Sequence, residues 1–139
     1  PQVYHDAMAR LKRKIDGARE HLPAPVIREE EKKDLGVIFY GSMENSIVEI
    51  DDMLEESGLS VSTCRVRALP LHSGVEDFVR RHDRTIVLEI NRDGQLFGII
   101  RKEFPAELIP KIHSVSYSDG MPPRARVYSD MILEVLEGL

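Results

Sequence analysis

The stretch GVIFYGSMENSIVEIDDMLEESG, residues 36–58, decides the fold class. It begins with a continuous apolar run, GVIFY, which is typical of a parallel strand covered on both faces. After a Gly-Ser turn, the apolar residues take the spacing of an amphipathic helix, at Met43, Ile47, Ile50 and Leu54. We expect Ser42 to cap the start of this helix and Gly58 to end it in the left-handed conformation. A strand joined tightly to a helix predicts an α/β fold.

The same alternation of strands and helices continues along the chain. Strands are predicted over residues 61–70, 85–90 and 112–117, and helices over residues 74–82, 95–103 and 124–137. The segment SDGMPP is expected to be a loop, because a glycine and two prolines break any regular pattern. This order predicts a mostly parallel sheet with helices on both faces.

The N-terminal residues have the pattern of a separate helix. Its apolar positions alternate in steps of four and three residues, which gives a narrow stripe along one face: Tyr4, Met8, Leu11, Ile15, Ala18 and Leu22. Prolines at positions 23 and 25 end the helix. The segment 23–34 is rich in proline and charge and is interpreted as a linker. We therefore expect a helix leading from an upstream domain at 1–22, a linker at 23–34 and the main domain at 35–139.

The composition is that of one soluble globular domain. The chain has 139 residues, 42% of them hydrophobic and 31% charged, with a net charge of -5. Nucleic-acid binders usually carry a basic stripe, whereas the run LKRK at 11–14 is diluted by nearby acids and is interpreted as a solvated helix face. No apolar run is long enough to cross a membrane. We expect neither a nucleic-acid nor a membrane partner.

The single cysteine, Cys64, limits the chemistry of this chain. One cysteine excludes an internal disulfide, a Cys-based zinc site and an iron–sulfur cluster, and it favours a cytoplasmic location. Because Cys64 falls within a predicted strand, we interpret it as a buried, inert thiol. The five histidines are scattered and form no metal-binding spacing. The sequence offers no nucleophile–base pair, so no catalytic residue and no metal ligand is predicted.

Candidate site residues follow two of the predicted strands. Gly41 and Ser42 occupy a position where α/β proteins often bind phosphate, but the glycine-rich phosphate motifs are absent. This turn is either structural or a contact at the edge of a ligand. Arg65 and Arg67 are predicted on the same side of a strand, where they serve in ion pairs or an interface, or are simply exposed.

Glu89 ends a buried strand and is the most informative candidate. A carboxylate buried there without partners would cost several kcal/mol, so it should accept backbone N–H groups or pair with an arginine. Gly94 and Gln95 can start a helix that points its N-terminus at this carboxylate. We expect Glu89 and Asn91 to anchor this turn or an interface, with ligand contact as the alternative.

These residues also carry a family resemblance. The chain over about residues 35–135 resembles the C-terminal part of the α subunit of 2-oxoacid:ferredoxin oxidoreductases. The resemblance depends on Gly41-Ser42, on Leu69-Pro70, on the ExNxxGQL pattern of Glu89, Asn91, Gly94, Gln95 and Leu96, and on the SDGMPP loop. The segment LHSG at 71–74 departs from the acidic or proline-rich segment that the family has there.

The resemblance implies a fold and a role. It implies a transketolase C-terminal-like domain, a three-layer α/β/α sandwich with a mixed sheet of about five strands and one antiparallel edge strand. Enzymes of this family oxidatively decarboxylate a 2-oxoacid, here expected to be 2-oxoglutarate or a broad set, to acyl-CoA, with ferredoxin as acceptor. The whole enzyme would use thiamine diphosphate, Mg²⁺, an iron–sulfur cluster and CoA.

The motifs that hold those cofactors are missing from this chain. The G-D-G…N motif for magnesium and diphosphate is absent, as are the cluster cysteines. We therefore expect this chain to bind no cofactor and to be inactive alone, as a piece of a longer protein that associates with a β subunit and an upstream α-subunit domain. A homodimer of the fragment is also considered. The alternative function is a self-contained, flavodoxin-like binding module for a nucleotide or CoA.

Overall fold

A five-stranded mixed sheet forms the centre of the molecule. The structure, a computed structural model, describes residues 1–138 except for the side chain of Glu20. The strands are β1 (Val26–Arg28), β2 (Leu35–Tyr40), β3 (Val61–Val66), β4 (Arg84–Glu89) and β5 (Ile112–Ser116). Their order across the sheet is β1-β3-β2-β4-β5, and only β1, at one edge, is antiparallel to its neighbour.

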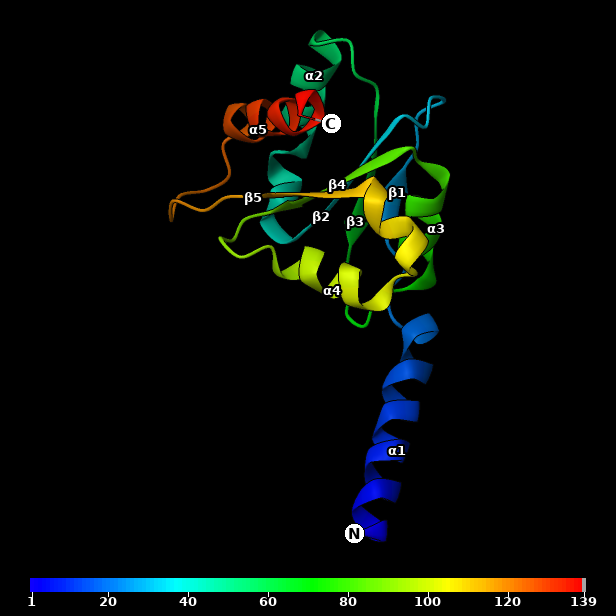
Figure 1. Ribbon diagram of the computed structural model, residues 1–139. Helices are drawn as coiled ribbons and strands as arrows, with labels where there is room; N and C mark the ends of the chain where they lie inside the picture. Colours follow the sequence, from blue (N-terminus) through cyan, green and yellow to red (C-terminus); the bar gives the residue numbers. More distant parts are fainter. Residues whose placement is uncertain (139) are drawn as a thin grey trace.

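Helices cover both faces of this sheet. They are α1 (Gln2–Ala18), α2 (Ile47–Glu56), α3 (Ser73–Arg81), α4 (Gln95–Glu103) and α5 (Ala125–Glu137), with short 3-10 turns at η1 (Arg19–His21), η2 (Gly41–Asn45) and η3 (Ala106–Lys111). One face is covered by α2 and α5, and the other by α3 and α4 (Figure 1). The predicted three-layer α/β/α sandwich, with a mostly parallel sheet and one antiparallel edge strand, is confirmed.

The central strand β2 supplies both halves of the core. Val37 and Phe39 face α2 and α5, whereas Ile38 between them belongs to the cluster under α3 and α4. Successive side chains of a strand point to opposite faces, so a strand between two helical layers is apolar throughout. This explains why the GVIFY run shows no alternation.

The helix after β2 starts later than the sequence suggests. Gly41–Asn45 forms the 3-10 turn η2, and α2 begins only at Ile47. The prediction that Ser42 caps this helix is therefore wrong. Ser46 precedes the helix, but its hydroxyl donates to the carbonyl of Pro123 at 2.9 Å. The predicted end is confirmed: Gly58 has a φ of 83°, and the amides of Gly58 and Leu59 bond back to the last turn of α2.

The segment interpreted as a linker contributes a strand to the sheet. β1 lies within residues 23–34 and pairs with β3, with Ile27 opposite Cys64. Arg28 binds Asp51 on α2 at 2.5 Å, and the amide of Glu30 donates to the hydroxyl of Ser62 at 3.1 Å. β3, which was predicted over residues 61–70, ends at Val66. The ordered sheet therefore begins before Leu35.

α1 projects away from the layered body (Figure 1). None of its residues is buried, and its apolar stripe is open to solvent. An ion pair of 3.0 Å joins Arg19, just after the helix, to Glu103 at the end of α4. No helix in the described part of the chain is long and apolar enough to cross a membrane.

Candidate functional site

The carboxyl ends of β2 and β4 meet at the middle of the sheet. From β2 the chain passes through α2 to β3 on one side, and from β4 it passes through α4 to β5 on the other. The point where connections leave two neighbouring parallel strands in opposite directions is where open α/β sheets usually place a site. Tyr40, Gly41, Glu89 and Asn91 lie at this switch point.

Glu89 is fully buried at the end of β4 and holds the start of α4. One carboxylate oxygen, Oε1, accepts the backbone N–H of Leu96 at 2.7 Å, and the other, Oε2, accepts that of Phe97 at 3.0 Å. The first turn of a helix has N–H groups without partners inside the helix, and these favour a nearby negative charge. The backbone contacts expected for Glu89 are therefore present.

Asn91 connects this anchor to β2, the neighbouring strand in the sheet. Its Oδ1 accepts the backbone N–H groups of Asp93 at 3.0 Å and Gly94 at 2.7 Å, which closes the turn after β4. Its Nδ2 donates to Glu89 Oε1 at 2.9 Å and to the hydroxyl of Tyr40 at 3.1 Å. All the polar atoms of the Asn91 side chain are used in holding neighbouring groups.

Gly94 is required by the geometry of this turn. Its φ is 61°, in the left-handed region that L residues avoid. A Cβ at this position would lie 3.2 Å from the hydroxyl oxygen of Ser114 and 3.7 Å from Glu89 Oε2. A Cβ here would therefore require the Ser114 hydroxyl to shift, in addition to the backbone strain at this φ.

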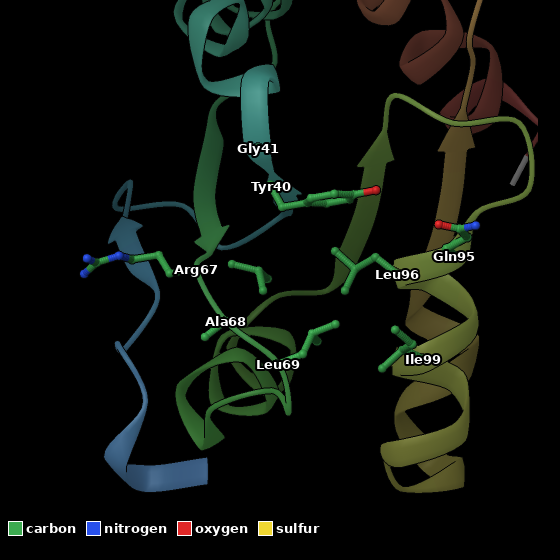
Figure 2. A pocket seen from close by; sticks show the side chains of 9 residues that line it. Tyr40, Gly41, Arg67, Ala68, Leu69, Gln95, Leu96 and Ile99 are labelled. Carbon is green, nitrogen blue, oxygen red and sulfur yellow. The ribbon is translucent and has the colours of Figure 1, made fainter. Parts of the chain in front are cut away.

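A cavity of about 500 Å³ opens beside this anchor. We call it the switch-point cavity; its walls are Tyr40, Gly41, Val66, Arg67, Ala68, Leu69, Gln95, Leu96 and Ile99. The segment after β3 forms one wall and α4 the other, and the Tyr40 ring lies across one end (Figure 2). The guanidinium of Arg67 points away from the other lining side chains (Figure 2). Most of the wall is therefore apolar.

The two candidate arginines do not form a common site. Arg65, on β3, pairs with Glu44 of η2 at the surface. Arg67 lies beyond the end of the strand and is exposed, and no ion pair to it is present among the described side chains. The prediction of an ion pair is confirmed for Arg65, whereas the shared strand face is wrong because β3 ends at Val66.

The other candidates fall into two groups. The structure brings Gly41, Gln95, Glu89, Asn91 and Gly94 together at the switch point, and leaves Ser42 exposed outside the cavity wall. Sequence reasoning missed Tyr40. Its position as the last residue of β2, followed by Gly41, was the only signal, and its bond to Asn91 depends on the pairing of two distant strands.

Reactive groups lie away from this cavity. Burial raises the pKa of the Cys64 thiol to about 12, so it stays protonated at neutral pH. His82 is fully buried; its Nδ1 lies 2.7 Å from the carbonyl of Phe78, and burial lowers its pKa. The cavity wall contains no aspartate, glutamate, histidine, lysine or cysteine. No cluster of three metal-ligating side chains occurs among the described residues. The arrangement is suited to holding segments together or to apolar contact.

Comparison with known proteins gives a fold-level likeness. No family model matches the chain, and no curated protein matches it. It superimposes on a 2-oxoglutarate:ferredoxin oxidoreductase from Magnetococcus marinus, solved with 2-oxoglutarate, coenzyme A and succinyl-CoA bound, with a TM-score of 0.77 and 22% identity. That superposition covers 96% of this chain and 23% of the other.

A second solved structure is a split-gene transketolase, described as an inactive β4 tetramer. Its TM-score is 0.56 and the identity 18%, over 78% of this chain and 40% of that one. The chain therefore spans less than half the length of either protein. Because both identities are below 25%, the two likenesses show a fold that this chain shares with a part of each protein.

Proposed function

We propose that this chain is a domain of a 2-oxoacid:ferredoxin oxidoreductase, corresponding to the C-terminal part of the α subunit. The observation that carries the proposal is the superposition on the Magnetococcus enzyme, which takes in nearly the whole of this chain, α1 mostly included. The ExNxxGQL residues support it, because they form the anchor between β4 and α4. The chain's role is subunit and domain association, within an enzyme that converts 2-oxoglutarate or related 2-oxoacids to acyl-CoA with ferredoxin as acceptor.

The residues present do not fit the enzyme's cofactors. Thiamine diphosphate binds through Mg²⁺, which prefers carboxylate and other oxygen ligands, but the cavity wall has no carboxylate and Glu89 already accepts three hydrogen bonds. An iron–sulfur cluster needs several thiolates, and Cys64 is a single buried thiol. Cofactor binding and chemistry are therefore assigned to other parts of the enzyme.

The proposal is tested in the whole enzyme. Deleting residues 35–139 should abolish co-purification of the β subunit and the 2-oxoacid-dependent reduction of ferredoxin. Glu89→Gln and Asn91→Ala should reduce assembly more than they change the affinity for thiamine diphosphate. Arg92→Ala is the matched control, because Arg92 lies in the same turn and its side chain is 87% exposed. Full assembly and activity after the deletion would reject the proposal.

The cavity gives a reason to keep the second candidate, a binding module for a nucleotide or CoA. Its volume is sufficient for part of such a ligand, and it lies at the switch point. The phosphates have no evident partner, since η2 is a short 3-10 turn and the Arg67 guanidinium points away. Calorimetry with ATP, NAD and CoA on the isolated chain distinguishes the two: micromolar binding would favour the module.

A further inference from the structure

The exposed apolar stripe of α1 is bordered by positive charge on both sides. Four large side chains of the stripe lie within α1, and each is at least 43% exposed: Tyr4, Met8, Leu11 and Ile15. At about 100° per residue, Lys12 and Lys14 lie roughly 80° to either side of the centre of the stripe. Of the two acids of the helix, Asp6 lies about 170° and Asp16 about 110° from that centre.

These flanking charges are available to a partner. Lys14 has no ion-pair partner among the described side chains. Lys12 pairs with Asp16 at 2.7 Å, but both side chains are more than half exposed, and such a pair is weak. α1 carries four basic and two acidic residues, whereas the whole chain has a net charge of -5. The helix is thus a basic element on an acidic protein.

This charge pattern argues against a second copy as the occupant. The stripe has the a/d spacing of a coiled-coil seam, in which the flanking residues of the two helices face each other. In a parallel pair of two copies, Lys14 of one copy would face Arg19 of the other, just after α1. An antiparallel pair centred near Lys12 and Lys14 would bring lysine against lysine. Like charges in such positions oppose association and select against the wrong partner.

The shape of the stripe argues against a membrane surface. Helices that lie on membranes present a broad apolar face with a large hydrophobic area. The α1 stripe is instead one residue wide at each turn, and the opposite face includes Asp6 as well as Arg13. A narrow seam with charged borders suits another helix.

We propose that α1 docks, through this stripe, against an amphipathic helix of a partner protein whose apolar seam is bordered by Asp and Glu. Charge complementarity carries the inference: carboxylates beside the partner's seam would meet Lys12 and Lys14 while the apolar residues are buried. The inference rests on the proposed role in subunit and domain association, for which it specifies the chemistry of the contacted surface.

The test uses two three-heptad helical peptides with leucine at positions a and d. One has glutamate at e and g and the other has lysine. Binding of each labelled peptide to the whole chain is followed by fluorescence anisotropy. At about 0.1 M salt the glutamate peptide should bind at least about tenfold more tightly, and the difference should shrink at about 1 M salt, where the screening length falls from about 10 Å to about 3 Å.

Variants separate the contribution of the apolar stripe from that of the flanking lysines. Leu11→Ser combined with Ile15→Ser should weaken binding at least about tenfold without changing the melting temperature, because α1 has no buried residue. Lys12→Glu combined with Lys14→Glu should reverse the preference between the peptides. Arg13→Glu, on the opposite face, is the matched charge control and should preserve the preference.

Several outcomes would overturn the inference. Equal affinity for both peptides would show that Lys12 and Lys14 do not select the partner by its charge. A dimer in sedimentation equilibrium that Leu11→Ser dissociates would identify a second copy as the occupant. Leu11-dependent binding to vesicles of phosphatidylcholine and phosphatidylserine, with no peptide binding, would identify a membrane. None of these results depends on enzyme activity or on deleting residues 35–139, so failure here is distinguishable from failure of the proposed function.

Discussion

Glu89 and Leu96 are joined by a hydrogen bond of 2.7 Å that links the end of β4 to the first turn of α4. The residue at the N-cap position of α4 is Gly94, which has no side chain to offer. The capping acceptor therefore comes from the preceding strand, five residues before Gly94. This arrangement fixes the direction of α4 and, with it, one wall of the switch-point cavity.

Removing the charge of Glu89 should destabilise the domain. In Glu89→Gln, the new amide group faces one of the three donors now bound by the carboxylate, so a buried donor loses its acceptor. The expected loss is about 1–3 kcal/mol in the free energy of unfolding, measured by urea titration. Asp93→Asn, in the same turn but exposed, should change it by less than about 0.5 kcal/mol. Equal effects would show that the anchor contributes little.

The anchor was predictable because its physics is local. A carboxylate that follows TIVL is forced into the interior, and the helix start lies only a few residues further along the chain. The contact of Asn91 with Tyr40 was not predictable, because it joins positions 51 residues apart through the pairing of β2 with β4. The prediction that Ser42 caps a helix was wrong for a related reason. A 3-10 turn follows β2, and Ser46, which precedes α2, is bonded to the distant Pro123.

Two glycines, Gly94 just before α4 and Gly98 within it, should respond in opposite directions to substitution by alanine. Gly94→Ala places a Cβ on a backbone with a φ of 61° and 3.2 Å from Ser114 Oγ, so we expect a loss of about 1–2 kcal/mol or more. Gly98 lies exposed within the helix with nothing within 4 Å of an added Cβ, so Gly98→Ala should gain about 0.5–1 kcal/mol. Thermal melts of both variants test this. A Gly94→Ala variant as stable as the unmodified chain would contradict the left-handed conformation of Gly94.

Cys64 should make the domain sensitive to alkali. Burial raises the pKa of its thiol from 9.0 to about 12, so above pH 9 the unfolded chain loses this proton while the folded chain keeps it. Stability from Cys64 is therefore complete below pH 9 and is lost toward pH 12, at about 1.4 kcal/mol per pH unit. Urea titrations at pH 8 and pH 10 should differ less in Cys64→Ala than in the unmodified chain. An identical difference in the two chains would show that another group causes the loss of stability in alkali.

His82 should make the domain sensitive to mild acid. Burial lowers the pKa of His82, and its Nε2 has no partner among the described atoms, so a proton there would place a charge in a buried site without an acceptor. The folded state resists protonation that the unfolded chain accepts below about pH 6.5, so stability falls as the pH drops below that value. The melting temperature of His82→Asn, which keeps a donor for Phe78, should fall less between pH 7 and pH 5. His21→Asn, at an exposed position, is the control.

The edge strand β1 pairs with β3 ahead of Leu35, and truncation tests whether the folded domain begins at β1. Three residues are too few for a strand pattern in the sequence; β1 exists because β3 offers an open edge, where Ile27 pairs with Cys64.

A chain beginning at Ala24 should match the stability of the full chain within about 0.5 kcal/mol, because no residue of α1 is buried. A chain beginning at Leu35 loses the β1 pairing and the Arg28–Asp51 ion pair, and leaves β3 as an exposed edge prone to association. We expect it to lose at least about 2 kcal/mol and to aggregate as its concentration rises, measured by urea titration and light scattering. Equal stability of the two truncated chains would restore residues 23–34 as a linker outside the domain.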